Sequence, residues 1–437
     1  MLEQRLADAA AALRRLDEQV FEVQPRLGQK GREVGEEESE ADDGALALGD
    51  QGLGRRPGPE QVRRERLGRH LEQVRELLEL GQATDETDDV GEVARLGRAD
   101  EDIGSAGNGF GHGDDSGIDA APYSAGMSLD PYVPKRTARS RFVEARGLRH
   151  HLLEWGDAAA ATATRPPLVM LHGWMDVAAS FQFVVDAFGE DRPVLALDWR
   201  GFGLSDTPAA DTYYFPEYLG DLEGVLDALF GAGHAPIDLL GHSMGGNVAM
   251  LYAGVRPQRI RRLVNLEGFG MPRSKPADSP VRIAKWLDSL KAEEQLRPYP
   301  SLDAVADRLR KTNPLLRADR AAWLAAQWSA PHGGDGGRRL LADPNHKRAS
   351  PLNAQVDEWL EAWKRIEAPV LWVEGDRTDI SIWWGDRYSK AEFHERLSLV
   401  KDVRRHVVSP AGHMLHHDRP EDIAKLLEAF LSESRPS

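Results

Sequence analysis

The sequence predicts an α/β fold, in which a mainly parallel sheet has helices on both faces and a helical cap is inserted over one end. Short apolar runs bounded by turn residues recur from about residue 140 onward, as in strands that are covered on both faces. Stretches of helical periodicity alternate with these runs, which is typical of a parallel sheet. The interval 271–367 contains five tryptophans and is too long for a crossover helix and too apolar for a structureless loop. We therefore expect it to form the cap.

The expected elements follow one another in a regular order. The segments RFVEA and HHLLEW predict a hairpin at the start of the folded part. The strands of the main sheet are expected at 166–171, 193–198, 236–241, 262–268, 369–375 and 404–410. The helices between and after them are expected at 216–231, 244–254, 388–399 and 419–433, with Pro420 in a first turn, where it costs no hydrogen bond. The core would thus consist of residues 127–270 and 368–437, interrupted by the cap.

Residues 1–126 form an acidic extension of low complexity. They contain 15 Lys and Arg against 29 Asp and Glu, and no Trp. A segment with so few large apolar groups cannot bury enough surface to offset its ordering entropy, so we expect it to be disordered. Apolar residues at heptad spacing in 2–20 and 67–78 leave open a short coiled coil. Met127, after which the composition becomes that of a globular protein, is an alternative start of the native chain.

Composition excludes several classes of protein. There is no cysteine, which rules out a disulfide framework, a cysteine metal site and a thiol nucleophile. The N-terminus is interrupted by charges and no apolar run is long enough to cross a bilayer, so neither a secretory signal nor a membrane span is expected. The net charge of −16 argues against nucleic-acid binding. We expect a cytoplasmic protein that acts on a small molecule, and the sequence does not indicate its oligomeric state.

A serine between glycines is the strongest chemical signal. In GHSMGG, Ser243 follows an apolar strand and precedes a helix rich in small residues. This is the strand–turn–helix setting of a nucleophile elbow, in which a strained turn projects the serine hydroxyl above the sheet. Gly241 and Gly245 are expected there because a Cβ at either position would collide with a neighbouring strand or helix. The alternative, a serine in an ordinary turn, requires that no base and acid accompany it.

Such partners are present in the expected order. In SPAGHMLHHDRPE, His413 follows the last strand, where it can swing over the edge of the sheet and act as the base, while His416 and His417 lie further on. In VEGDRTDISIWW, Asp379 is favoured as the acid over Asp376. Glu267, after the fourth main strand, is an outside alternative.

The remaining candidate residues lie around the nucleophile. An oxyanion hole is expected from the backbone N–H groups of Met244 and Trp174. His172 and Gly173 are expected to support the loop that carries Trp174. A substrate pocket is expected to include His242 and three cap tryptophans, namely Trp286, Trp323 and Trp328, although packing of the cap on the core is the alternative for most of them.

These motifs together resemble the α/β-hydrolase family, specifically its cap-bearing serine hydrolases of the esterase, lipase and serine-hydrolase-like group. The successive matching segments are LHGWMD, DWRGFGLSD, GHSMGG, GDRTD and AGHMLHHDRPE, and the resemblance runs from about residue 140 to the C-terminus. The acid loop departs from the pattern, because it is spaced Gly-x-x-x-Asp rather than the more frequent Gly-x-x-Asp. Members that open epoxides or displace halide carry aspartate at the elbow, where this chain has serine.

The resemblance implies a serine hydrolase that needs no metal or organic cofactor. We expect a carboxylesterase that cleaves small to medium apolar esters through an acyl-enzyme intermediate. Cleavage of a carbon–carbon bond, a thioester or a lactone by the same triad remains an alternative, and so does a catalytically silent ligand-binding module.

Overall fold

A computed structural model describes residues 132–333 and 336–433. The expectations for 1–126, including the heptad-spaced segments and the alternative start at Met127, lie outside these residues. In the described part strands alternate with helices, as the sequence predicts.

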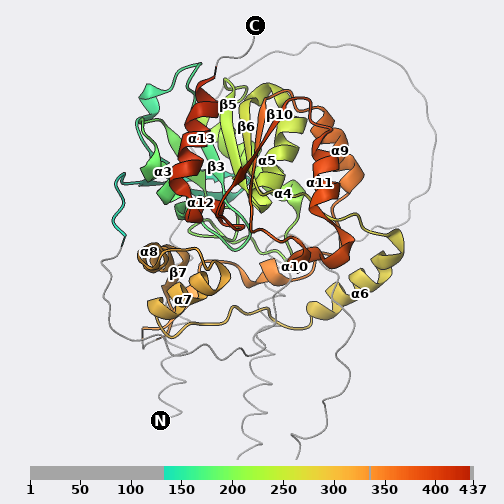
Figure 1. Cartoon of the computed structure of the whole chain (residues 1–437). Coiled ribbons are helices and arrows are strands. Elements are labelled where there is room, and N and C mark those ends of the chain that lie inside the picture. Colours follow the sequence, from blue (N-terminus) through green and yellow to red (C-terminus); the bar gives the residue numbers. More distant parts are fainter. Residues whose placement is uncertain (1–131, 334–335, 434–437) are drawn as a thin grey trace, which may run out of the picture. The chain divides into compact units, whose positions relative to one another are not determined.

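Eight strands form one sheet in the order β1-β2-β4-β3-β5-β6-β9-β10 (Figure 1). Their bounds are β1 Arg139–Ala145, β2 Leu148–Trp155, β3 Leu168–Leu171, β4 Val194–Leu197, β5 Ile237–His242, β6 Ile260–Leu266, β9 Val370–Gly375 and β10 Val403–Val408. Each strand expected from the sequence is present. The hairpin β1–β2 is antiparallel and β2 joins β4 antiparallel, whereas all pairs from β4 to β10 are parallel. The carboxyl ends of β3, β5, β6, β9 and β10 therefore meet at one edge of the sheet.

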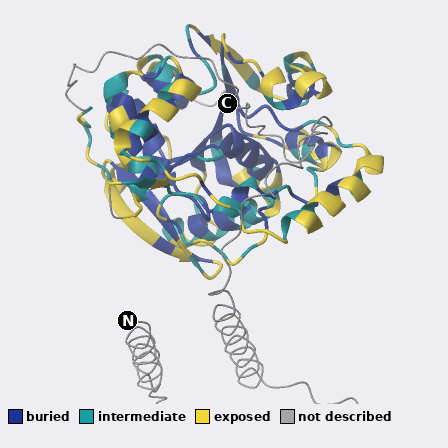
Figure 2. Ribbon diagram, turned by 90° about the horizontal axis from the view of Figure 1, so that it is seen from below, coloured by how far each residue is buried: buried dark blue, intermediate teal, exposed yellow. Residues whose placement is uncertain are grey.

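Helices cover both faces of the sheet. On one face the buried core includes residues of α4 (Phe215–Phe230), α5 (Met244–Val255), α9 (Val356–Lys364) and α11 (Lys390–Leu397). On the other face it includes residues of α3 (Gln182–Ala187), α12 (Leu415–Asp418) and α13 (Pro420–Ser432). Figure 2 shows the central strands fully buried, while the surrounding helices expose their outer faces. The short helix α3 was not expected, because six residues are too few to show a helical period.

The segment that is expected to form the cap lies beyond the carboxyl edge of the sheet. It contains α6 (Ser279–Ser289), α7 (Leu302–Thr312), α8 (Ala318–Trp328) and a ribbon of β7 (Ser329–Pro331) and β8 (Arg338–Leu340), which gather below the sheet in Figure 1. Helices α7 and α8 share a small apolar core of their own, to which Phe183 of α3 also belongs. This segment thus has a small core of its own, and it packs on α3 through Phe183.

Helix α9 falls within the interval expected to form the cap, and its buried residues belong to the core on one face of the sheet. The backbone of Ala362 in α9 approaches Gly254 in α5 so closely that a Cβ at Gly254 would lie 2.1 Å from the Ala362 oxygen. Helical periodicity in the sequence indicates which face of α9 is buried, but it does not indicate which element packs against that face. Among the described residues, no helix is both long and apolar enough to cross a membrane.

Candidate active site

Ser243 sits on a strained turn between β5 and α5. Its backbone has φ 51° and ψ −116°, a conformation that costs a non-glycine residue of the order of 1–3 kcal/mol and is found mainly at functional sites. Its N–H donates to the Leu266 oxygen at 2.9 Å, which ties the turn to β6. A Cβ at Gly241 would lie 2.2 Å from the Gly245 oxygen, and one at Gly245 would lie 2.2 Å from the Leu171 oxygen. The two glycines are therefore sterically required for this turn.

His413 bridges Ser243 and Glu267. Its Nε2 lies 2.9 Å from the Ser243 Oγ, and its Nδ1 lies 2.7 Å from the Glu267 Oε2. The His413 side chain is 22% exposed and that of Glu267 is fully buried. The arrangement is that of a nucleophile, a base within hydrogen-bond reach and an acid that orients the base.

Glu267 is held by the loop that follows β9. It comes directly after β6 and has a positive φ of 56°. Its Oε1 accepts the Gly375 N–H at 2.6 Å and the Thr378 hydroxyl at 2.7 Å. Burial acts to raise the pKa of the Glu267 carboxyl, while the hydrogen bonds from Gly375 and Thr378 act to lower it. These bonds fix the carboxylate where it can accept a hydrogen bond from the Nδ1–H of His413.

Burial lowers the pKa of His413 below its usual value. The shifts of His413 and Glu267 have one physical cause, which is the cost of placing a charge where water has little access. The imidazole is therefore uncharged at neutral pH, as a general base must be.

The expected contact between Asp379 and His413 is wrong in this structure. Asp379 is exposed, and its Oδ1 accepts the Ser381 N–H at 2.9 Å, at the start of α10 (Ser381–Trp384). Asp376 is exposed as well and accepts the Ser409 hydroxyl at 2.6 Å and the Ala411 N–H at 2.9 Å. Asp376 thus braces the loop that carries His413 but does not orient its ring. The outside alternative, Glu267, occupies the position instead.

A signal for Glu267 was present in the sequence. An acidic residue stands between the apolar strand that ends at Leu266 and Gly268, at the same sheet edge as Ser243. The neighbouring strand β9 ends beside it and is followed by Asp376 and Asp379, the two acids that the sequence pattern favours.

The loop after β3 packs against the elbow. His172 is fully buried, its Nδ1 donates to the Gly173 oxygen at 2.7 Å, and its Nε2 accepts the Trp199 N–H at 3.1 Å. A Cβ at Gly173 would lie 3.2 Å from the Cβ of Ser243, so the loop runs close to the nucleophile. Trp174 and Met244, the expected oxyanion donors, both line the cavity described next.

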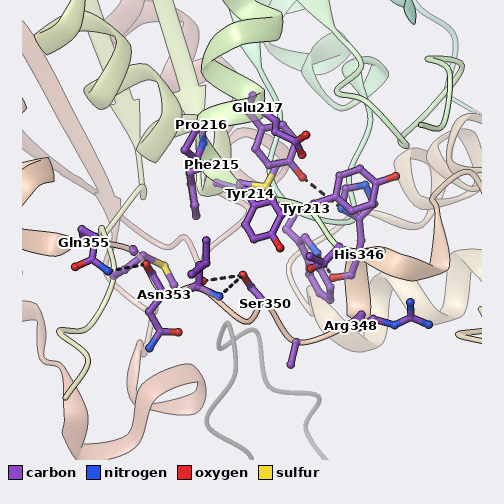
Figure 3. Close-up of a pocket in the computed structure, with 18 of the residues that line it drawn as sticks. Tyr213, Tyr214, Phe215, Pro216, Glu217, His346, Arg348, Ser350, Asn353 and Gln355 are labelled. Atoms are coloured by element: carbon purple, nitrogen blue, oxygen red, sulfur yellow. Dashed lines mark hydrogen bonds between the residues drawn. The ribbon is translucent and has the colours of Figure 1, made fainter. Parts of the chain in front are cut away.

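A cavity of about 920 Å³ opens at the elbow (Figure 3). Trp383 lines it, and the Trp383 ring lies 4.5 Å from the ring of His413, so the cavity passes close to that histidine. Its apolar walls include Phe215, Trp359 and Met271. The cavity is large enough for an ester of small to medium size.

The expected pocket residues lie elsewhere. His242 is fully buried beneath the elbow and its Nε2 donates to the His413 oxygen at 2.8 Å. Trp323 and Trp328 pack on the core that α7 and α8 share. None of these three, nor Trp286, is among the residues that line the cavity, which instead include Trp174, Trp359 and Trp383. The spacing of tryptophans along a helix shows that they lie on its inner face. It does not show whether they line a cavity or pack in a core, because tryptophans are found on the inner face in both cases.

Comparison with known proteins identifies the fold family. Residues 168–426 match the alpha/beta hydrolase family. The chain belongs to the alpha/beta hydrolase family.

The relatives of this alpha/beta hydrolase are named for different hydrolase activities. The chain is 25% identical over 282 residues to a serine hydrolase-like protein of Danio rerio, covering 62% of this chain and 82% of the relative. It is 31% identical over 327 residues to epoxide hydrolase 3 of Siraitia grosvenorii, covering 67% of this chain and 97% of the relative. Among solved structures, a thioesterase domain from the curacin biosynthetic pathway is similar with a TM-score of 0.57 at 24% identity, covering 67% of this chain and 99% of that domain. At that identity the likeness concerns the fold.

Three buried side chains beside the elbow of this hydrolase could hold a metal ion. One atom each of Asp176, His242 and His416 lies within 4.8 Å of the others. Asp176 Oδ2, His242 Nδ1 and both ring nitrogens of His416 have no hydrogen-bond partner. Buried polar atoms without partners are costly, and a cation or a bridging water at their centre would satisfy them. His242 of this cluster also donates to the His413 backbone oxygen.

Proposed function

We propose that this alpha/beta hydrolase is a serine carboxylesterase that acts through Ser243, His413 and Glu267. The observation that carries the proposal is the position of His413, with one ring nitrogen 2.9 Å from the serine hydroxyl and the other 2.7 Å from the buried carboxylate. A hydroxyl is a weak nucleophile until a base removes its proton, and the base needs a group that fixes its tautomer.

The reaction follows from this geometry. The Ser243 Oγ attacks the ester carbonyl while His413 Nε2 takes the proton of the Ser243 hydroxyl. Glu267 stabilises the imidazolium that forms. The N–H groups of Met244 and Trp174 stabilise the oxyanion of the tetrahedral intermediate. His413 then gives its proton to the leaving alcohol. A water molecule, activated by the same histidine, releases the acid from the acyl enzyme.

The cavity supports an ester with an apolar portion. Phe215, Trp359 and Met271 offer apolar contact beyond the reacting end. Epoxide opening is not proposed, although relatives carry that name, because the elbow residue of this chain is Ser243 rather than aspartate.

The test compares the full chain with its Ser243→Ala variant on p-nitrophenyl acetate and butyrate. We expect the variant to lose at least about a thousandfold in kcat, and a fluorophosphonate probe to label only the parent. Circular dichroism and the melting temperature provide the control for folding. Equal rates for parent and variant would show that Ser243 does not carry the activity. No hydrolysis of either ester together with no labelling would favour the silent ligand-binding module.

Hydrolysis of a thioester, a lactone or a carbon–carbon bond would use the same three residues. A panel of such substrates separates these reactions from ester hydrolysis. If the probe labels Ser243 but a thioester is turned over at least tenfold faster than every oxygen ester, the carboxylesterase proposal is wrong while the triad stands.

A further inference from the structure

Basic side chains gather on the wall of the active-site cavity. Five cationic residues line it against two acidic ones, Glu217 and Glu358; the cationic residues are Arg282, Lys285, Lys347, Arg348 and Arg387. Glu217 is already paired with Arg200 at 3.0 Å. The chain as a whole has a net charge of −16, so the positive wall is a local departure from its overall charge.

Two of these guanidinium groups are buried without a close carboxylate. Arg282 is 9% exposed, and its Nε donates to the Pro351 oxygen at 3.1 Å. No acidic group within the described ranges forms an ion pair with Arg282. Arg348 is 8% exposed and donates to the Ala292 oxygen at 2.9 Å, while its paired carboxylate, Asp211, is 4.0 Å away and 73% exposed.

A buried charge that bonds only to carbonyl oxygens is not neutralised. Removing a charged group from water costs several kcal/mol, and neutral acceptors recover only part of that cost. An anion in the cavity would recover more of it, and a guanidinium presents its N–H groups in a fork that fits two oxygens of a carboxylate.

The charges and the reacting groups come from different parts of the fold. Arg282 is on the cap helix α6 and Arg348 follows the cap ribbon, whereas Ser243, Glu267 and His413 follow strands of the core. In Figure 3, Arg348 and His346 lie on one side of the cavity, and Phe215 and Gln355 lie on the other. The cavity is therefore polar and positive on its cap side.

We propose that the cavity takes an ester whose non-reacting end carries a carboxylate, which Arg282 binds with support from Arg348. This inference rests on the proposed esterase function and names its substrate class. The apolar walls contact the middle of such a substrate, and the cap arginines fix the far end.

The experiment uses two matched esters with the full chain. 4-Nitrophenyl hexanoate and the mono-4-nitrophenyl ester of adipic acid share a six-carbon acyl group and differ in a terminal methyl or carboxylate. After correction for spontaneous hydrolysis, we expect kcat/KM to be at least tenfold higher for the adipate ester. We also expect 0.5 M NaCl to reduce this preference, because salt screens charge interactions in a solvent-accessible cavity.

Variants of Arg282 test whether this residue causes the preference for the adipate ester. Arg282→Met should raise KM for the adipate ester about tenfold and change the hexanoate rate less than threefold, while Arg282→Lys should restore part of the loss. The matched control is Lys364→Met, which removes a cation from the exposed side of α9, where Lys364 forms an ion pair with Glu361. The control should leave both esters unchanged. The preference of the parent and its salt dependence test the inference even if the Arg282 variants do not fold.

The outcomes separate the two proposals. If Ser243-dependent hydrolysis of the hexanoate ester is as fast as that of the adipate ester, the carboxylate inference is wrong and the esterase proposal stands. If neither ester is hydrolysed and the fluorophosphonate probe does not label Ser243, the esterase proposal is wrong, and the carboxylate inference, which rests on it, falls with it.

Discussion

Glu267 and His413 are 146 residues apart in the chain, yet the Glu267 Oε2 lies 2.7 Å from the His413 Nδ1. The contact is possible because β6 and β9 are neighbours in the sheet and β10 follows β9, so the segments after all three strands meet at one edge. Gly375 at the end of β9 and Thr378 in the loop after it donate two hydrogen bonds that hold Glu267 in place.

Glu267→Gln should reduce kcat for p-nitrophenyl butyrate by about 10²- to 10⁴-fold, because the amide does not stabilise the imidazolium and can favour the wrong tautomer. Asp379→Asn is the matched control, since it makes the same chemical change at the acid that lies away from His413. It should change kcat less than threefold. If the Asp379 variant loses more activity than the Glu267 variant, the assignment of the acid is wrong.

The pH dependence of kcat/KM should show an acid limb with a midpoint below pH 6.5. Burial lowers the pKa of His413, so the neutral base persists to lower pH than an exposed histidine would allow, and activity is lost only as the pH falls through that lowered pKa. Glu267→Gln should move the midpoint lower still, because it removes the group that favours the protonated ring. A parent midpoint above pH 6.5 would contradict this account.

Gly245→Ala should destabilise the protein by about 3 kcal/mol or more, because overpacking at a rigid backbone contact forces the turn to move. The added Cβ would lie 2.2 Å from the Leu171 oxygen, which belongs to a strand of the core. Gly189→Ala is the control, since its Cβ would lie 3.5 Å from the nearest atom and should cost less than about 1 kcal/mol. Urea unfolding followed by circular dichroism measures both, and equal losses for the two variants would contradict the steric argument.

Asn313→Ala should lower kcat about tenfold through the position of the His413 loop. The Asn313 amide of the cap donates to Asp418 Oδ1 at 2.8 Å, and Asp418 Oδ2 accepts the Gly412 N–H at 2.8 Å, next to His413. Loss of one hydrogen bond to a charged group costs about 1.5–3 kcal/mol. Because Asp418 also holds the Gly412 N–H, part of this loss should displace His413 and thereby lower kcat.

Thr312→Ala removes the neighbouring side chain, whose hydroxyl donates only within its own helix, to the Arg308 and Leu309 oxygens at 3.0 Å. It should leave kcat within twofold of the parent. A comparable loss in the two variants would mean that the cap acts through its general stability rather than through Asp418.

Much of this protein was determined by the sequence alone, because the relevant signals are local. Apolar runs between turn residues predicted every strand of the sheet, and Gly241 and Gly245 predicted the turn at Ser243, since that turn depends on the absence of side chains within a few residues. His413 was predicted as the base from its place after the last strand, and it bonds to Ser243. Strands and helices show apolar residues at periods of two and 3.6 residues, and tight turns depend on a few neighbouring residues. These patterns lie within short segments, so they can be recognised without knowledge of the fold.

Three features were decided only by the tertiary structure. These are the acid that contacts His413, the tryptophan that lies against His413, and the packing of helix α9 on the core. Glu267, Asp376 and Asp379 all follow strands that end at the same edge, so sequence position could not show which of them contacts His413. The hydrogen bonds of each side chain show that Glu267 does. Trp383 rather than Trp323 or Trp328 lies against His413, and α9 packs on the core although it falls within the interval assigned to the cap. These choices depend on contacts between segments far apart in the chain, and such contacts are set by packing across the whole domain rather than by any local pattern.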